Sequence, residues 1–352
     1  MFNIRKMLVM GTFGFASGLP YILIFSTLSA WLRDVGISLS LIGFFSWIAL
    51  TYSLKFLWAP FVDRFSVPIL NRYGRRKSWI ILTQLIIVFC IFTLSSINPI
   101  DSLSFFIFIA FLIAFSGSIQ DIAIDAFRIE YADISDQGNL AAAYQFGYRL
   151  AILAATSLAL ILADNYGWST SYEVMGLLML TGLIGVVISK KENINTQLEI
   201  LNFKDSFTKP IKDFGSRYGF YLASLLLLIV ATYRLTDIVM GPMANPFYID
   251  MGYSLTEIGS VVKIVALIAS VIGVFLGGIL IKKIGLYYSL LTGAFLVMMT
   301  NACFSYVAIS QEDYILLGSI KMPLKLSLIV GLDSIAAGIV GTVNITFLTS
   351  MV

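Results

Sequence analysis

Apolar residues are grouped along the chain into ten long runs, which are separated mostly by short polar stretches. Each run has about the twenty residues that a helix needs to cross the hydrocarbon core of a bilayer. The pattern therefore predicts an all-α, polytopic transmembrane helical bundle with about ten spanning helices. The predicted spans are 7–32, 41–61, 78–97, 104–127, 139–163, 171–189, 218–241, 254–281, 286–309 and 327–351.

Composition agrees with a membrane protein and excludes several kinds of site. The chain is 59% hydrophobic and 12% charged, whereas soluble domains carry about 25% charged residues. It contains no histidine, so aspartate and glutamate are the available proton carriers. Cys90 and Cys303 lie in apolar runs and are interpreted as small buried residues, not as a disulfide or a metal site. We expect no cofactor and no nucleic-acid partner.

The positions of lysine and arginine predict the orientation of the chain. With the N-terminus in the cytoplasm, sixteen basic residues fall on the cytoplasmic side and three on the outer side. The first run, from Met7 to Leu32, is too long for the apolar part of a signal peptide and has no small-residue cleavage site. We therefore interpret it as the first span, preceded by a cytoplasmic N-terminus.

One long connection divides the chain after the sixth run. We expect an N-terminal six-helix half at 1–189, a cytoplasmic loop at 190–217, and a C-terminal half with four helices at 218–352. Apolar residues scattered through the loop suggest a short amphipathic helix on the membrane surface, interrupted at Pro210. A plain tether between the halves is the alternative.

The strongest candidate for function is a charged stripe at the end of the fourth run. Asp121, Asp125 and Arg128 are spaced i, i+4 and i+7, so they share one face of a helix. An isolated carboxylate in hydrocarbon costs about 2.5–3.5 kcal/mol, which favours a face turned toward a polar interior. We expect a substrate or proton pathway here; a structural Asp–Arg pair near the cytoplasmic helix end is the alternative.

Further charges fall inside the predicted spans. Eight charges facing lipid would cost about 24 kcal/mol, which exceeds the stability of a typical protein. We therefore expect them to line an interior and to neutralise one another in part, with Arg234 and Asp237 forming a charge pair on the seventh helix. The eight are Lys55, Asp121, Asp125, Arg149, Arg234, Asp237, Lys263 and Asp333.

Similar basic turns follow the second and the eighth run. The first turn holds Asp63–Arg64 and Gly74–Lys77, and the second runs from Gly278 to Gly285 with two lysines. Matching turns at matching places are typical of two parallel six-helix repeats. Ordinary positive charge on the cytoplasmic side is the alternative.

The first of these turns resembles a pattern of the major facilitator superfamily, G-x-x-x-D-R-x-G-R-R. Ala59 replaces the first glycine, about eight extra residues follow Arg64, and the second turn has Lys282 where the family has aspartate. The resemblance implies a cytoplasmic gate; a plain positive-inside anchor is the alternative. The matching residues are Asp63, Arg64, Gly74, Arg75 and Arg76.

Within that superfamily, the chain is similar to the AmpG-type muropeptide permeases. The similarity implies a proton-coupled permease of the bacterial inner membrane that imports N-acetylglucosaminyl-1,6-anhydro-N-acetylmuramyl sugars or peptides, and we expect a monomer. It is carried by GFASGLP at 14–20, IGFFS at 42–46, KFLWAP at 55–60, QDI at 120–122, DA at 125–126, GYRL at 147–150 and GGIL at 277–280.

The resemblance also implies twelve helices, whereas this chain ends at Val352 with the tenth run. We therefore expect a truncated reading frame, a fragment or a decayed copy. Alternative functions are transport of another sugar or acyl conjugate, and a non-transporting paralogue. An enzyme is not expected, because the sequence has no HExxH or GxSxG motif and only the Asp121/Asp125 pair would remain as an aspartyl site.

Such a cargo carries carboxylates, amides and sugar rings, which cations, amides and aromatic faces recognise. As alternatives, Lys55 or Arg149 neutralises Asp121, and the tyrosines serve packing or the membrane interface. The candidates are Lys55 and Arg149 for carboxylates, Gln120 and Gln145 for amides, and Tyr52, Tyr148 and Tyr233 for sugar rings.

For proton coupling, Asp121 is the first candidate, followed by Asp125 and by Asp333 on the tenth helix. Burial favours the protonated form of a carboxylic acid, while a nearby arginine favours the ionised form. These opposing effects allow protonation to change with the side of the membrane that the site faces.

Overall fold

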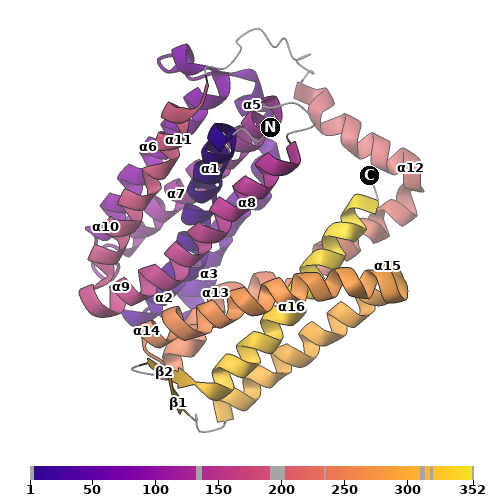
Figure 1. Cartoon of the computed structure of the whole chain (residues 1–352). Helices are drawn as coiled ribbons and strands as arrows, with labels where there is room; N and C mark the ends of the chain where they lie inside the picture. Colours follow the sequence, from indigo (N-terminus) through magenta and orange to yellow (C-terminus); the bar gives the residue numbers. More distant parts are fainter. Residues whose placement is uncertain are drawn as a thin grey trace. The chain divides into compact units, whose positions relative to one another are not determined.

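The computed structural model describes residues 4–131, 137–190, 203–233, 235–309, 314–317 and 320–350. Figure 1 follows the chain from indigo α1 to yellow α16. The elements are α1 (Ile4–Ile22), α2 (Leu28–Asp34), α3 (Leu39–Phe45), α4 (Leu50–Ser53), α5 (Ala59–Arg64), α6 (Arg75–Ser95), α7 (Leu103–Tyr131), α8 (Gln137–Leu153), α9 (Ala159–Tyr166), α10 (Trp168–Met179), α11 (Thr181–Ile188), α12 (Phe203–Thr232), α13 (Leu235–Asp250), α14 (Leu255–Glu257), α15 (Lys263–Ile309), β1 (Tyr314–Leu317), β2 (Ile320–Pro323) and α16 (Leu324–Ser350).

Within these described ranges, nine helical segments are long and apolar enough to cross a membrane. The eighth, Leu255–Ile309, breaks at Gly285, which takes a φ of +80° that glycine tolerates. Its two arms correspond to the eighth and ninth predicted spans. The prediction of an all-α polytopic bundle is confirmed.

The structure corrects the prediction for the region around the seventh span. The predicted span at 218–241 ends instead at Thr232, and the separate helix α13 follows it. Helix α12 is not interrupted at Pro210; it breaks at Gly219, which takes a φ of +71°. Proline keeps a φ close to the helical value and removes one hydrogen bond, whereas the left-handed φ at a glycine ends a regular helix.

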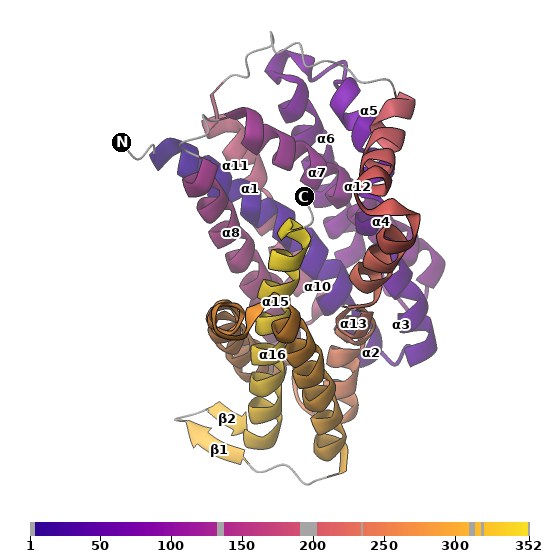
Figure 2. The same ribbon diagram turned by 90° about the vertical axis from the view of Figure 1, so that its right-hand side faces the viewer.

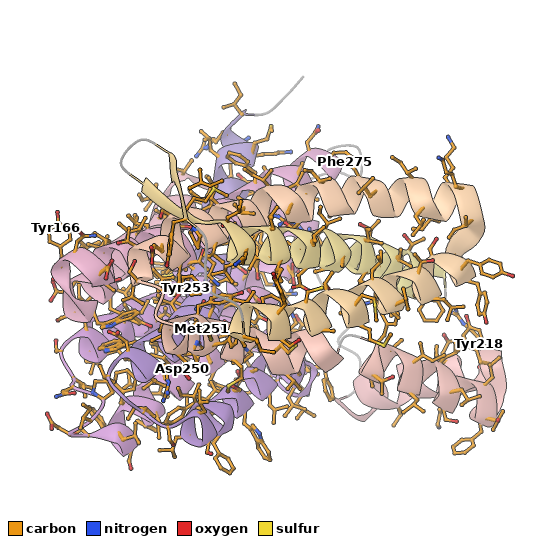
Figure 3. The ribbon with its side chains drawn as sticks, turned by 90° about the horizontal axis from the view of Figure 1, so that it is seen from below. Tyr166, Tyr218, Asp250, Met251, Tyr253 and Phe275 are labelled. Carbon is orange, nitrogen blue, oxygen red and sulfur yellow. The ribbon has the colours of Figure 1, made fainter. Side chains whose placement is uncertain are left out.

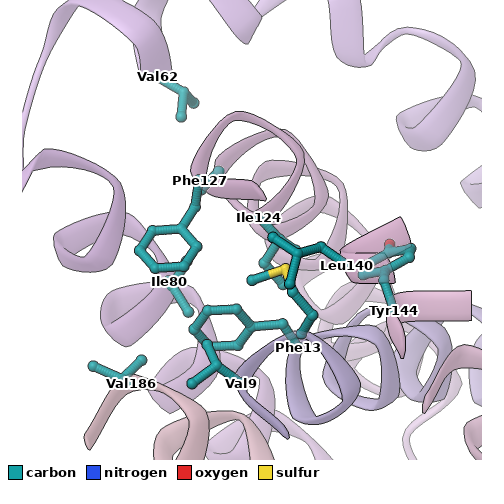
Figure 4. Packing of buried hydrophobic residues seen from close by; sticks show 11 residues of the cluster. Val9, Phe13, Val62, Ile80, Ile124, Phe127, Leu140, Tyr144 and Val186 are labelled. Carbon is teal, nitrogen blue, oxygen red and sulfur yellow. The ribbon is translucent and has the colours of Figure 1, made fainter. Parts of the chain in front are cut away.

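The first of two compact units comprises Met1–Ala223 and Pro242–Pro246. Its core joins helices that are far apart in sequence (Figure 4): Phe13 of α1 and Phe127 of α7 meet edge to face, with ring centroids 5.3 Å apart. Ile80 of α6 and Val186 of α11 belong to the same buried cluster. This packing holds α7, and therefore the charged stripe on it, firmly against α1.

Helices α1 and α8 cross at close range through glycine. A Cβ atom at Gly14 would overlap the carbonyl of Tyr144, and a Cβ atom at Gly147 would overlap the carbonyl of Gly11. Small residues at such crossings let membrane helices approach backbone to backbone. The crossing brings the middle of α1 close to Tyr144.

Several spans contain turns that are not α-helical. A π-helical turn, Leu23–Thr27, joins α1 to α2, and a second, Ala154–Leu158, joins α8 to α9. The hydroxyl of Thr27 donates to the carbonyl of Ala155, which links the two turns. The second span is tightened into 3₁₀ turns at Ser46–Ala49 and Lys55–Leu57. Irregular turns of this kind often mark functional positions in helices.

The second unit comprises Ser224–Gly241 and Phe247–Val352. Helices α15 and α16 lie side by side in Figures 1 and 2, and a Cβ atom at Gly338 of α16 would overlap the carbonyl oxygen of Ser270 on α15. An antiparallel hairpin of β1 and β2, with Ile315 opposite Met322, precedes α16. The sequence pattern did not predict this hairpin.

The outer surfaces of both units carry large apolar side chains. Phe275 of α15, for example, is 70% exposed and extends away from its helix (Figure 3). An exposed apolar surface is unfavourable in water and is the expected surface of a helix in lipid.

We predict that the α1–α8 crossing tolerates no larger side chain. Gly147→Val should destabilise the protein by about 1–3 kcal/mol or more, because the side chain would force the helices apart. Thermal unfolding in detergent measures the change. Gly278→Ala is the control, because a Cβ atom there meets no other atom within 4 Å; equal stability of the two variants would contradict the prediction.

Candidate functional site

Helix α7 carries the predicted charged stripe on a single face. The Asp125 Oδ1 and Arg128 Nη2 atoms lie 3.7 Å apart, one helical turn from each other. The Asp121 side chain is only 17% exposed, whereas that of Asp125 is 45% exposed. The structure therefore brings the three predicted residues together and places Asp121 deepest.

Lys55 connects the two carboxylates. Its Nζ atom lies 3.9 Å from Asp121 Oδ2 and 4.0 Å from Asp125 Oδ2. Lys55 begins the 3₁₀ turn of the second span, so the tightened backbone sets where this long side chain starts. This contact between Lys55 and Asp121 is compatible with the alternative interpretation of the sequence, in which Lys55 neutralises Asp121.

Ser17 and Tyr144 complete the surroundings of Asp121. The Ser17 hydroxyl donates to Asp121 Oδ1 and lies 2.8 Å from the Tyr144 hydroxyl. The Arg128 guanidinium lies over the Tyr144 ring, 5.6 Å from its centroid. Sequence reasoning missed Ser17; the signal available was its position in the small-residue stretch that also carries Gly14 and Gly18.

The polar candidates around this cluster fall into two groups. Gln120 donates to the carbonyl of Ala16 at 2.8 Å. Its Oε1 atom and the buried hydroxyl of Tyr52 have no hydrogen-bond partner among the described residues. In contrast, Gln145 and Arg149 are exposed on α8, and Tyr148 is half-buried between them along the chain. The structure does not bring Gln145 or Arg149 into contact with Asp121.

Three of the predicted gate residues, Asp63, Arg75 and Arg76, belong to an ion-pair network around the buried Arg76 side chain. Arg76 is 4% exposed at its side chain and donates to Asp63 Oδ1 at 2.5 Å and to Glu130 Oε1 at 2.9 Å. Arg75 reaches the same Glu130 oxygen at 3.4 Å. Gly74 precedes these arginines with a φ of +113°, a conformation that other residues rarely adopt. Arg64 lies beside Phe65 instead, 5.7 Å from the ring centroid.

Glu130 is a second residue that the sequence analysis missed. It lies at the cytoplasmic end that was predicted for α7, two residues after Arg128. Glu130 and Asp63 both bind Arg76. Only the folded chain shows this, because Glu130 and Arg76 are 54 residues apart in sequence.

The predicted residues of the second unit do not gather in the same way. Asp333 accepts a hydrogen bond from the Thr300 hydroxyl at 2.7 Å. Tyr233 donates its hydroxyl to the carbonyl of Leu290 at 3.0 Å, which ties helices together. Arg234 lies outside the described residues, as does the side chain of Asp237, so their predicted pairing stays a prediction.

The sequence profile of the Major Facilitator Superfamily matches residues 5–352. The chain belongs to this superfamily. Major facilitator relatives include the putative transporter AmpG 4 of Rickettsia conorii, which is 35% identical over 300 residues, 84% of this chain and 72% of that protein. The anhydromuropeptide permease of Escherichia coli is 33% identical over 308 residues, which are 87% of this chain and 61% of the permease.

Solved structures of major facilitator transporters have the same fold. The xylose transporter XylE of Escherichia coli, in an inward-open conformation, gives a TM-score of 0.63 at 12% identity, over 97% of this chain and 81% of that one. A bacterial homologue of the human lysosomal transporter Spinster gives 0.62 at 15% identity, over 98% and 75%. At these identities the likeness shows the fold alone. Together with the superfamily match and the transporter relatives, the fold shows a multi-pass membrane transporter of the major facilitator type.

We predict that Lys55 stabilises the carboxylates of the cluster. Lys55→Met should lower the stability by about 1 kcal/mol, discounted for the partial exposure of the lysine. The double variant Lys55→Met/Asp121→Asn should recover most of the loss, because the deepest charge is then removed as well. Thermal unfolding in detergent of the wild type, Lys55→Met, Asp121→Asn and the double variant measures this coupling. Lys190→Met is the control at an exposed lysine. Additive losses would show that Lys55 and Asp121 act separately.

We predict that the gate network depends on the fork of Arg76 and not on its charge alone. Arg76→Lys should destabilise the protein by about 1–3 kcal/mol, because one ammonium cannot reproduce the planar donor set that serves Asp63 and Glu130. Thermal unfolding tests this. Arg72→Lys is the matched control, since Arg72 is exposed and contacts its neighbour Tyr73. Wild-type stability of Arg76→Lys would contradict the prediction.

Proposed function

We propose that this major facilitator transporter imports cell-wall muropeptides, N-acetylglucosaminyl-1,6-anhydro-N-acetylmuramyl sugars or peptides, together with protons. The observation that carries the proposal is the cluster in which Lys55 bridges Asp121 and Asp125 inside the membrane-spanning part of the first unit. A charge cluster in that position is expensive and is typical of substrate or ion pathways. The names of the relatives in Rickettsia conorii and Escherichia coli support the choice of cargo.

Asp121 is the residue proposed to bind the transported proton. It receives a hydrogen bond from Ser17 and faces Lys55 at the distance of a weak ion pair. Protonation of Asp121 would remove its attraction for Lys55, so binding of a proton changes the contact between α7 and the second span. Asp125, which retains Arg128 as a partner, is the second candidate, and Asp333 in the second unit is the third.

Exposed polar groups on α8 are proposed to meet the cargo. Arg149, Gln145 and Tyr148 present a cation, an amide and an aromatic ring on neighbouring turns of one helix. Arginine binds a carboxylate through two parallel hydrogen bonds, and aromatic rings suit the apolar faces of sugars. The other candidates contact protein atoms in this structure through their polar groups, except for the Tyr52 hydroxyl and the Gln120 Oε1 atom. These candidates are Lys55, Gln120, Tyr52 and Tyr233.

The remaining expectations belong to the same proposal. Residues 1–189 and 218–352 form two repeated halves, linked by 190–217. The predicted gate residues Asp63, Arg64, Gly74, Arg75 and Arg76 open and close the cytoplasmic side, and the contacts of Arg76 with Asp63 and Glu130 support this role. The proposal also puts the N-terminus in the cytoplasm, which the excess of basic residues predicted for that side supports. It further includes a monomer in the bacterial inner membrane.

We predict that Asp121→Asn abolishes proton-driven uptake. Cells that lack their own permease would express the chain and receive radiolabelled anhydromuropeptide, with and without a protonophore. The wild type should accumulate the label, the protonophore should prevent accumulation, and the variant should stay at background because its amide cannot bind or release the proton.

Asp213→Asn is the matched control, because Asp213 forms an exposed pair with Arg217 and such pairs contribute little. Insertion of each variant in the membrane is verified by fractionation. Absence of uptake by correctly inserted wild type would contradict the proposed cargo. Undiminished, protonophore-sensitive uptake by Asp121→Asn would contradict the role of Asp121.

A further inference from the structure

The second unit contains a lysine inside an apolar membrane segment. Lys263 follows the π-helical turn Ile258–Val262 and begins α15. It lies about 12 Å along the helix from Leu255, the first residue of the segment, and this segment contains an 18-residue stretch with a mean hydropathy of 2.8. A lysine at such a depth costs about 2.5–3.5 kcal/mol if it faces lipid, so its surroundings have to explain its presence.

An aromatic ring is the partner that the structure gives to Lys263. Its Nζ atom lies over the ring of Tyr248, 5.9 Å from the centroid, and Tyr248 is 5% exposed. Such a cation–π contact contributes about 0.5–2 kcal/mol, which offsets only part of the cost of burying the charge. Among the residues that the structure describes, no carboxylate forms an ion pair with Lys263.

The nearby acid of the same unit does not supply the missing charge. Asp333 accepts a hydrogen bond from the Thr300 hydroxyl, and among the described residues it forms no ion pair with Lys263. Lys55, in contrast, lies within 4.0 Å of two carboxylates. Of these two membrane lysines, Lys55 is neutralised by two carboxylates, whereas no described carboxylate forms an ion pair with Lys263.

The backbone holds this charge in a defined place. A Cβ atom at Gly273 or at Gly338 would overlap the opposite helix, so α15 and α16 are in backbone contact two to three turns after Lys263. Lys263 as a whole is half-buried, so part of the residue remains accessible. A fixed, partly accessible cation beside an aromatic wall suits a carboxylate attached to a sugar ring.

We propose that Lys263 and Tyr248 form an anion-binding site in the second unit that takes a carboxylate of the transported sugar conjugate. The site rests on the proposed transport function and extends it by naming the group on the cargo that is recognised. The carboxylate neutralises Lys263 while the sugar packs on Tyr248. Cargo binding thereby supplies the counter-charge that the protein lacks at this position.

The test compares two probes that differ only in this charge. N-acetylglucosaminyl-1,6-anhydro-N-acetylmuramic acid and its methyl ester are titrated against the purified full chain, and the ratio of the two affinities is determined by calorimetry. The wild type should prefer the acid by about tenfold or more, as expected for a hydrogen bond between charged groups. Lys263→Gln should bring the ratio close to one, Lys263→Arg should keep it, and the exposed-lysine control Lys283→Gln should leave it unchanged.

Each result decides the proposal. An unchanged preference for the acid in Lys263→Gln, or equal affinities in the wild type, would overturn it. Lys263→Met, which keeps an unbranched apolar stem, replaces the glutamine variant if that variant does not fold. Uptake of the acid into proteoliposomes is measured in parallel: binding without uptake would refute the transport function while the affinity ratio still decides the site. Binding of neither probe by folded wild type would refute both.

Discussion

A charge inside a bilayer is costly unless the protein or a bound group stabilises it, because hydrocarbon offers no hydrogen bonds. In the first unit this constraint is met at Asp121, where a lysine from another span and a serine hydroxyl from α1 take the place of water. The exposure of Asp125 and of Lys55 keeps these ion pairs weaker than fully buried ones. A weak pair can be made and broken at small cost, which a proton-binding carboxylate requires.

The backbone features of the first unit follow from this arrangement. Ser17 reaches Asp121 because its side chain is short and α1 packs against both α7 and α8, the latter through Gly14 and Gly147. The 3₁₀ turn at Lys55 narrows the second span locally and sets the origin of the lysine side chain. Conformational irregularity is therefore concentrated beside the charges, where regular α-helices would place these groups differently.

The sequence allowed some of this to be predicted and not the rest, for identifiable reasons. Spans are predictable because the bilayer demands about twenty apolar residues, and the stripe of Asp121, Asp125 and Arg128 is predictable because the helical period is local. The pairing of Glu130 with Arg76 and of Ser17 with Asp121 depends on contacts between distant segments, which no local pattern reports. The break at Gly219 rather than at Pro210 shows the same limit, because both residues are plausible helix breakers and the surrounding chain selects one.

The two membrane lysines, Lys55 and Lys263, have different partners. Lys55 has its counter-charge in the protein, so its attraction for a substrate anion is opposed by Asp121 and Asp125. Lys263 has an aromatic face, whose quadrupole attracts a cation without cancelling its charge. An anion that approaches Lys263 therefore gains an interaction without breaking an existing ion pair. In the proposed symport mechanism, a neutralised cation such as Lys55 responds to protonation of its carboxylates, whereas Lys263 responds to the charge of the cargo.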